Sequence, residues 1–231
     1  MTHSNLSVVR TVADLRKQVA DLRNAGKRIG FVPTMGALHD GHLALVAEAR
    51  RRSEAVVASV FVNPTQFAAH EDLGTYPRQE ARDAELLAAA GCSVLFAPEA
   101  AEMYPDGFAT SVQVGGPSEG LETDFRPHFF GGVAVVVAKL LNQVQADTAV
   151  FGEKDYQQLM VVRRMARDLD IPTEIVGAAT VRDEHGLALS SRNAYLSADE
   201  LAVARRLNVI LREAGERAAA GELVAAAEAG A

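Results

Sequence analysis

The chain has 231 residues, which suffices for one sizeable α/β core or for a core with a small appendage. Hydrophobic residues make up 48% and charged residues 23% of the chain, and this composition is typical of a globular protein rather than a disordered one. The net charge of -7 argues against a general nucleic-acid-binding protein, because such proteins usually carry an excess of basic residues.

The single cysteine, Cys92, lies in an apolar stretch, so no intrachain disulfide can form and an oxidising compartment gains no support. The N-terminus lacks the apolar run of a signal peptide. No segment approaches the ~18 apolar residues of a membrane span. We therefore expect a soluble, cytoplasmic protein in which Cys92 is a small buried thiol.

Short apolar runs alternate with amphipathic segments along most of the chain. We predict strands at residues 28–32, 56–62, 93–96, 148–151 and from 174 to 176 onward, and helices at 43–52, 79–90, 132–144 and 156–169. Residues 110–114 alternate and should be extended, either at a sheet edge or in an excursion. Strands that alternate with helices predict an α/β fold with a doubly wound, mostly parallel sheet. Ligand loops should then lie at the carboxyl ends of the strands.

The character of the sequence changes after about residue 181. A polar loop at residues 182–193 precedes a long helix, which should begin after Ser197 with a capping box between Ser197 and Glu200. From residue 214 onward the chain is mostly Ala, Gly and Glu, which form helices but offer little bulk for packing. We therefore expect two domains, at residues 1–180 and 181–231.

The stretch at residues 33–42 reads Pro-Thr-Met-Gly-Ala-Leu-His-Asp-Gly-His and connects a predicted strand to a predicted helix. Its glycines allow a ligand to approach the backbone closely, and a helix N-terminus favours anions. His39 and His42 are three residues apart, so both can face a phosphate from a first helical turn. Two surface histidines in a turn are the alternative, but the strand–turn–helix context favours a phosphate site.

Two neutral amides, Asn63 and Gln66, follow the second predicted strand. Amides suit hydroxyls and carboxylates without adding charge. Taken alone, this segment favours ordinary turn chemistry around Pro64.

Two more polar stretches occur later in the chain. After the strand at 148–151, Lys154 can neutralise phosphate, Asp155 can cap a helix or accept a ribose hydroxyl, and Gln158 shares a helix face with Lys154. Residues 189–193 read Leu-Ser-Ser-Arg-Asn, and their hydroxyls and guanidinium suit a triphosphate. In isolation these stretches are a charged helix cap and a solvated loop.

The four stretches, together and in this order, resemble those of the pantothenate synthetase family, and the resemblance extends to about residue 207. The family belongs to the Rossmann-like nucleotidyltransferases related to class I aminoacyl-tRNA synthetases. Residues 39–42 resemble the HIGH motif of that group, and residues 189–193 stand where its KMSKS loop lies. The family condenses (R)-pantoate with β-alanine: the pantoate carboxylate attacks the α-phosphate of ATP, and the β-alanine amine then attacks the pantoyl-adenylate.

The resemblance also implies partners and residue roles. It implies ATP as a substrate, Mg²⁺, a homodimer, and neither nucleic acid nor membrane as a partner. His42 would be the proton donor, with His39 and Lys154 as further catalytic residues, and Asp83 would reach magnesium through water. The residues implied to bind ATP, with the backbone of Val181 at the adenine, are Met35, Gly36, Ala37, Leu38, His39, Asp40, Gly41, His42, Gly152, Glu153, Lys154, Asp155, Val181, Leu189, Ser190, Ser191 and Arg192. Those implied to bind pantoate are Gln66, Gln158, Asn63 and Arg126, with Gln66 also at the β-alanine position.

The charges of these residues fit the implied reaction. Its nucleophile is already an anion and needs no general base, so the difficulty is to bring a carboxylate to a polyanion. The two histidines, Lys154 and Arg192, with a helix N-terminus and Mg²⁺, supply the compensating charge.

The sequence departs from the family pattern at several positions. Leu189 stands where the family usually has Met, a near-isosteric exchange, and Asp40 replaces a common Glu. Phe129 occupies the usual His position, and His128 lies one place early. Family members continue into a fuller C-terminal lid domain. We therefore expect residues 181–231 to form a small, shortened lid that carries the KMSKS-like loop, either because the chain is truncated or divergent or because the lid itself is reduced.

Two alternatives remain at this stage. An adenylyltransferase could use the same histidine chemistry to make a dinucleotide or a coenzyme precursor, but it would lack the paired Gln66 and Gln158 contacts. A non-catalytic nucleotide-binding or oligomerising module, inactive because of its short C-terminus, is the second alternative.

Overall fold

Six parallel strands form one sheet in the part of the chain that the computed structural model describes, residues 6–67, 74 and 78–222. Each strand pairs in parallel with its neighbours, in the order β1-β4-β3-β2-β5-β6. The strands are β1 (Ser7–Val9), β2 (Ile29–Thr34), β3 (Ala55–Val60), β4 (Val94–Phe96), β5 (Thr148–Gly152) and β6 (Glu174–Ala178). The predicted parallel α/β fold is confirmed.

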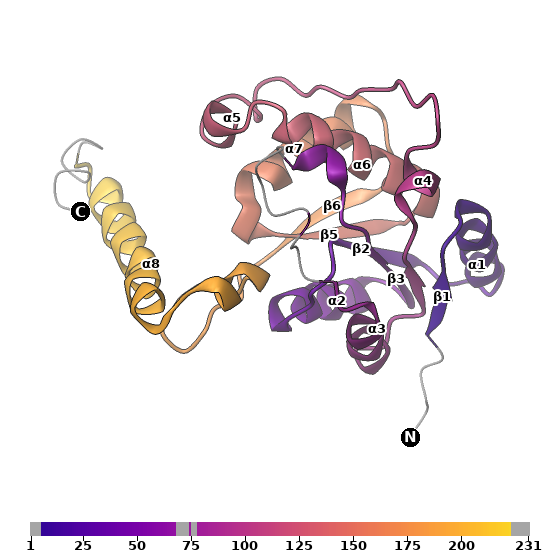
Figure 1. Ribbon diagram of the computed structural model, residues 1–231, viewed down its shortest axis with the longest axis horizontal. Coiled ribbons are helices and arrows are strands. Elements are labelled where there is room, and N and C mark those ends of the chain that lie inside the picture. Colours follow the sequence, from indigo (N-terminus) through magenta and orange to yellow (C-terminus); the bar gives the residue numbers. More distant parts are fainter. Residues whose placement is uncertain (1–5, 68–73, 75–77, 223–231) are drawn as a thin grey trace. The chain divides into compact units, whose positions relative to one another are not determined.

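Helices connect the strands and continue beyond them (Figure 1). They are α1 (Val12–Asn24), α2 (Asp40–Arg52), α3 (Glu80–Ala89), α4 (Ala100–Met103), α5 (Glu122–Phe125), α6 (Phe129–Val144), α7 (Tyr156–Asp168) and α8 (Ala198–Ala219), with short 3-10 helices η1 (Pro64–Gln66), η3 (Glu153–Asp155) and η4 (Ser191–Tyr195). All of the predicted helices are present, and α6 begins three residues before its predicted start.

The predictions missed β1, α4 and α5, which are too short to show a period, and they gave no range for α1. Residues 110–114 do not join the sheet, so the edge-strand alternative is wrong and the excursion is correct. The alternation is nevertheless real, because Val112 and Val114 are half-buried against the core while Ser111 and Gln113 are exposed.

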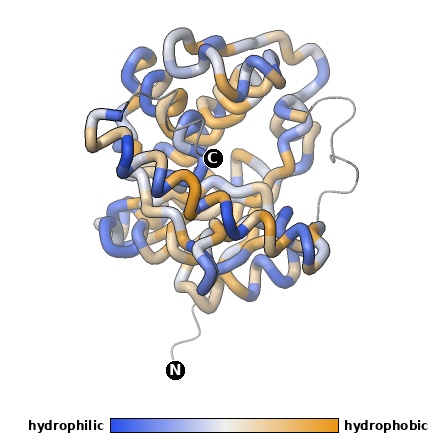
Figure 2. The backbone as a smooth tube through the Cα atoms, turned by 90° about the vertical axis from the view of Figure 1, so that its left-hand side faces the viewer, coloured by the Kyte–Doolittle hydropathy of each residue, from blue (hydrophilic) through white to orange (hydrophobic). Residues whose placement is uncertain are grey.

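Two apolar layers cover the sheet. Helices α1, α6 and α7 pack on one face, and α2 and α3 pack on the other (Figure 1). Side chains alternate between the faces along each strand: Val57 of β3 belongs to the first layer, and Val56 and Ala58 belong to the second. Figure 2 shows the resulting succession of apolar and polar stretches along the backbone. The sheet is covered on both faces, as parallel sheets are.

Helix α6 is the most buried of the described helices, with 12 buried residues out of 16. A helix that is apolar all round belongs in a core, which explains why its run of valines does not form a strand. No helix in the described ranges combines the length and the apolar character needed to cross a bilayer.

The strand order places the chain reversal at the centre of the sheet. Strand β2 lies between β3 and β5, and the chain proceeds from β2 to β3 and β4 on one side before it returns to β5 and β6 on the other. In open parallel sheets, ligands bind beside the carboxyl ends of the strands at such a reversal. The turns after β2 and β5 therefore form the natural site.

The chain forms two compact units, Met1–Leu38 with His42–Ala179, and His39–Gly41 with Thr180–Ala231. In the second unit, the predicted polar loop is partly a hairpin: Arg182 pairs antiparallel with Ala188, and the Leu189 N–H donates to the Val181 carbonyl at 2.9 Å. Helix α8 follows, and the predicted capping box between Ser197 and Glu200 is present. None of its residues is buried.

Candidate active site

The turn after β2 has a conformation that few residues tolerate. Gly36 and Ala37 both have positive φ, 85° and 52°. A Cβ atom at Gly36 would lie 3.0 Å from Asp83 Oδ2 and 3.1 Å from Val60 Cγ1. Both the left-handed backbone and the close approach therefore require glycine at this position.

Asp83, in the first turn of α3, holds this turn in place. Its Oδ2 accepts the Ala37 N–H at 2.9 Å, its Oδ1 accepts the Leu38 N–H at 2.8 Å, and the residue is only 1% exposed. Hydrogen bonds to an ionised acceptor are about twice as strong as neutral ones. The carboxylate therefore fixes the backbone that leads into the histidine motif.

The described residues offer few protein ligands for a magnesium ion. Within the described ranges, no three His, Cys, Asp or Glu side chains form a group that could hold a metal. Magnesium usually keeps several waters and binds through one or two carboxylates and the substrate phosphates. The residues thus fit an ion that arrives with ATP, and the water-mediated role of Asp83 stays a prediction.

His39 and Gly41, both in the second compact unit, are in close contact: a hydrogen bond joins them, and the His39 ring occupies the space beside the Gly41 Cα atom. His39 Nδ1 accepts the Gly41 N–H at 3.1 Å, so the ring proton of the neutral imidazole is on Nε2. A Cβ atom at position 41 would lie 2.8 Å from His39 Cε1. Because α2 begins at Asp40, His39 precedes the helix, whereas His42 lies in its first turn and Asp40 is exposed.

The amides after β3 form a connected cluster. Asn63 Nδ2 donates to Gln66 Oε1 and to the Gly132 carbonyl, both at 3.1 Å, and Gln66 Nε2 points to Met35 Sδ at 3.0 Å. Asn63 is 1% exposed. Asn63 is therefore buried and forms hydrogen bonds within the protein, to Gln66 and to the Gly132 carbonyl. Its direct contact with pantoate stays a prediction.

Gly132 of α6 touches the backbone of this loop. A Cβ atom at Gly132 would lie 2.3 Å from the Thr65 carbonyl oxygen and 2.8 Å from the Gln66 nitrogen. Because those atoms are backbone, they cannot move aside as the end of a flexible side chain can. The position therefore accepts only glycine.

Tyr104, next to α4, was not predicted as a site residue. Its hydroxyl donates to Asn63 Oδ1 at 2.8 Å. Burial raises the pKa of Tyr104, and its hydrogen bond with Thr65 opposes this only in part. The residue is 41 positions from Asn63 in sequence, and nothing in its local pattern indicates that contact.

Phe129, which departs from the family pattern, contacts Arg126, just after α5, and Phe130, in the first turn of α6. Arg126 Nε pairs with Glu122 Oε1 at 2.6 Å, and its guanidinium carbon lies 4.0 Å from the centroid of the Phe129 ring. Phe129 also packs edge-on against Phe130, while His128 is exposed. The phenyl ring therefore supports Arg126 through a cation–π contact.

The turn after β5 carries the second predicted charged stretch. Lys154 and Asp155 lie in η3 with exposed side chains, 3.4 Å apart. Gln158 is half-buried in the first turn of α7. The neighbouring Gln157 instead donates to the Pro117 and Gly120 carbonyls and accepts the Glu122 N–H, so it holds the 117–122 segment. The sequence analysis assigned a role to Gln158 and none to Gln157.

In the second unit, the hairpin leads directly into the Leu-Ser-Ser-Arg stretch. Ser190 Oγ accepts the Arg192 N–H at 3.2 Å and caps η4. The hairpin tip is organised by Asp183, which accepts the N–H groups of His185 and Leu187 and pairs with Arg205 of α8. Desolvation alone would raise the pKa of Asp183, but these donors outweigh it and hold the pKa below its usual range.

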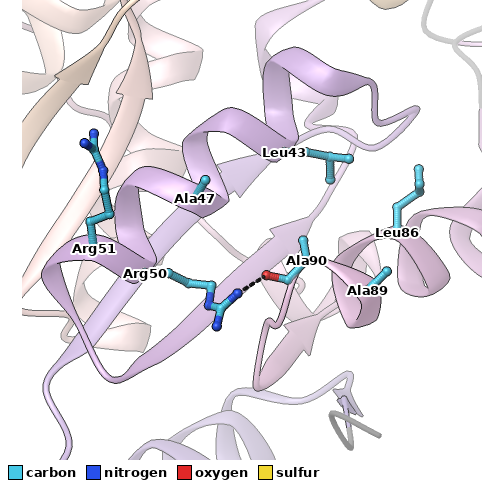
Figure 3. A pocket seen from close by; sticks show the side chains of 7 residues that line it. All are labelled: Leu43, Ala47, Arg50, Arg51, Leu86, Ala89 and Ala90. Carbon is cyan, nitrogen blue, oxygen red and sulfur yellow. Dashed lines mark hydrogen bonds between the residues drawn. The ribbon is translucent and has the colours of Figure 1, made fainter. Parts of the chain in front are cut away.

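A groove of about 610 Å³ lies between α2 and α3 (Figure 3). It is lined by Leu43, Ala47, Arg50, Arg51, Leu86, Ala89 and Ala90. Its one internal hydrogen bond in Figure 3 joins Arg50 to the Ala90 carbonyl, at 3.1 Å. Because no predicted site residue lines it, we place the active site at the strand ends instead.

The fold and the site define a class of protein. A doubly wound parallel sheet, a strained glycine turn before a histidine-bearing helix, and a second charged turn across the reversal point are features of an α/β enzyme that binds a nucleotide. The amide cluster beside them suits a small polar substrate.

Comparison with known proteins identifies the family. A family model described as Pantoate-beta-alanine ligase matches residues 7–230. The pantothenate synthetase of Mesorhizobium japonicum is 63% identical over 218 residues, which cover 94% of this chain and 77% of that protein. The chain belongs to the pantoate–β-alanine ligase family.

Solved structures agree with this result. The pantothenate synthetase of Thermus thermophilus superposes with a TM-score of 0.88 at 54% identity, over 96% of this chain and 79% of that one. The pantoate-β-alanine ligase of Francisella tularensis, solved as a complex with "Beta-gamma ATP" and β-alanine, has a TM-score of 0.81 at 38% identity, over 90% and 79% of the two chains. The activity of this chain is that of its family, the ATP-dependent ligation of pantoate to β-alanine.

Proposed function

We propose that the residues brought to the carboxyl ends of β2, β3 and β5 carry this ligation through a pantoyl-adenylate, with release of AMP and pyrophosphate. The observation that carries the proposal is the Gln66 amide, whose oxygen is held by Asn63. Its NH₂ group is thereby available to donate to a pantoate oxygen. An adenylyltransferase has no need for such an amide.

The first step joins an anion to a polyanion, so the protein must supply positive charge and hydrogen-bond donors. His42 donates to the phosphates from the first turn of α2, and His39 adds its Nε2 proton. Lys154 neutralises phosphate charge, and Gly152, Glu153 and Asp155 hold the ribose and the phosphates. Because the pantoate carboxylate is already ionised, no side chain has to remove a proton from it.

The remaining assignments complete the site. Met35, Gly36, Ala37 and Leu38 provide backbone for ATP. In the second unit, Val181 meets adenine with its backbone, and Leu189, Ser190, Ser191 and Arg192 bind the triphosphate. Gln158 and Arg126 bind pantoate, and Gln66 serves both pantoate and β-alanine.

Three further features belong to the proposal. Mg²⁺ enters with ATP and screens the phosphate charge when it is bound. The protein works as a cytoplasmic homodimer. Neither a nucleic acid nor a membrane takes part.

Product analysis tests the proposed function. The protein is incubated with (R)-pantoate, β-alanine and Mg·ATP, and pantothenate, AMP and pyrophosphate are quantified. We expect all three in equal amounts, and only a stoichiometric adenylate with pyrophosphate when β-alanine is left out. Stable transfer of AMP to a phosphate-bearing acceptor would identify an adenylyltransferase, and ATP binding without adenylate would identify a non-catalytic module.

The role of His42 is tested separately with His42→Ala. We expect pantoyl-adenylate formation to fall by at least ~10²-fold, as when one transition-state donor is removed from other enzymes. His185→Ala is the matched control, because that imidazole is half-exposed and its ion-pair contact is with Glu184. An unchanged rate in His42→Ala would remove His42 from its assigned role.

A further inference from the structure

We infer that Tyr104 is a positioning residue for the substrate amide of Gln66 and that it acts through Asn63. The inference rests on the proposed role of Gln66 and adds a residue that lies outside the four motifs of the sequence. It concerns which end of each amide faces the substrate.

Tyr104 and the loop after β3 fix the orientation of Asn63. The Tyr104 hydroxyl is 2.8 Å from Asn63 Oδ1, and the Thr65 hydroxyl and N–H lie 3.0 and 3.3 Å from the same atom. The Thr65 N–H can only donate, so this end of the amide must be the oxygen. The NH₂ group of Asn63 therefore faces the opposite way.

The orientation of Asn63 then determines that of Gln66. The Asn63 NH₂ group faces two acceptors, the Gly132 carbonyl and Gln66 Oε1, both at 3.1 Å. With its oxygen held there, Gln66 turns its own NH₂ group toward Met35 Sδ at 3.0 Å. A thioether is a weak acceptor, so a carboxylate or hydroxyl oxygen of pantoate would replace it favourably.

Aromatic packing fixes the position of the Tyr104 ring. It packs edge-on against Phe108, with ring centroids 5.1 Å apart, and tilted against Phe61 at 6.2 Å. Tyr104 also packs against the main core cluster. The hydroxyl is therefore presented to Asn63 from an anchored ring and not from a mobile side chain.

Without the tyrosine hydroxyl, Asn63 Oδ1 keeps only the two Thr65 donors, at 3.0 and 3.3 Å, and loses its shortest hydrogen bond. The orientation of Asn63, and with it that of Gln66, is then held less firmly, and any fraction of Gln66 that turns its Oε1 acceptor toward the pantoate oxygens opposes binding. ATP, which is assigned to other residues, would be unaffected. Tyr104 thus has a signature that a purely structural residue lacks.

The experiment is Tyr104→Phe, which removes one oxygen atom and leaves the ring packing intact. We expect a rise of about 3- to 10-fold in the Kd and KM for pantoate, the scale of one neutral hydrogen bond, with the KM for ATP unchanged. Tyr156→Phe is the matched control, because that ring is 61% exposed. Unchanged pantoate parameters in Tyr104→Phe, with or without a lower Tm, would overturn the inference.

A double-mutant cycle shows whether the effect passes through Gln66. In a Gln66→Ala background, Tyr104→Phe should change the pantoate Kd by less than about 1.5-fold, because coupled residues are not additive. A full, additive effect would overturn the inference. A wild-type protein that forms no pantothenate would instead refute the proposed function, so the two failures can be told apart.

Discussion

Gly41 leaves the space that the His39 imidazole occupies. We predict that Gly41→Ala lowers the rate of pantoyl-adenylate formation by about 10-fold or more, because small displacements of catalytic groups have large kinetic effects. The added Cβ would lie 2.8 Å from His39 Cε1 and would force the ring away. Pyrophosphate release is the measurement. Gly215→Ala is the control, since a Cβ there meets no atom within 4 Å, and equal rates in the two variants would contradict the prediction.

We expect Cys92 to be unreactive toward thiol reagents in the folded protein. Burial raises its pKa to about 12, against a small opposite effect of Arg50, and only the thiolate reacts. We predict no labelling by a thiol reagent at pH 8 and one equivalent after unfolding in denaturant. Rapid labelling of the folded protein would contradict this.

The same shift gives a stability prediction. The pKa of Cys92 in the folded protein is above the ordinary value of 9.0, so the folded protein holds the thiol proton more tightly than the unfolded chain does. The contribution of this proton to the free energy of unfolding is fully present below about pH 9 and is lost as the pH rises toward about 12. Unfolding free energies measured from pH 8 to 11 should therefore fall less steeply in Cys92→Ala than in the wild type.

Between elements, Asp83 ties α3 to the turn after β2. We predict that Asp83→Asn destabilises the protein by about 1–3 kcal/mol, because an amide has one acceptor and leaves one buried backbone N–H without a partner. Adenylate formation should fall as well, by about 10-fold. Chemical denaturation and pyrophosphate release are the measurements, and Glu80→Gln, an exposed change in the same helical turn, is the control.

The same variant separates the two roles of Asp83. If the carboxylate acted only on magnesium, a higher Mg²⁺ concentration would restore the activity of Asp83→Asn and the stability would stay close to that of the wild type. A positional role predicts that added Mg²⁺ restores neither.

The elements were predictable where the sequence carries a long pattern. Strands such as β3 are apolar on both faces, and α2, α3 and α7 have helical periods, so their types were correct and their ends differed by a few residues. The order of the strands was not predictable, because it depends on which apolar faces meet. A hairpin inside the polar loop was missed because its main anchor, Asp183, bonds to backbone groups that no side-chain pattern identifies.

The candidate site followed the same rule. The histidine motif could be predicted because the features that define it are adjacent in sequence: a strand, a glycine turn and the start of a helix. Asn63 and Gln66 have the same side-chain chemistry in the sequence, but one is buried beneath the other. Tyr104 enters only through a contact with a residue 41 positions away, and such contacts exist only once the chain has folded.

At the scale of the whole molecule, the two compact units should differ in local stability. We predict that the backbone amides of α8 exchange with solvent faster than those of α6, by at least about 10²-fold. None of the residues in α8 is buried, whereas most of α6 is, and helices with few buried contacts open at low free energy. Hydrogen exchange followed by mass spectrometry measures both helices in one sample. Equal protection of α8 and α6 would contradict the prediction.

The contact of Gly132 with the Thr65 carbonyl limits how mutations can alter the acid specificity of this enzyme. The backbone of the core helix α6 and the loop that carries Gln66 are shaped against each other with no side chain between them. A mutation that reshapes the loop for a different acid would alter a surface on which α6 rests. Changes in acid preference at this loop should therefore show epistasis with positions around 132, whereas the turns after β2 and β5, which we propose to bind ATP, can stay as they are. Directed evolution toward new carboxylates should vary the two stretches together in one library.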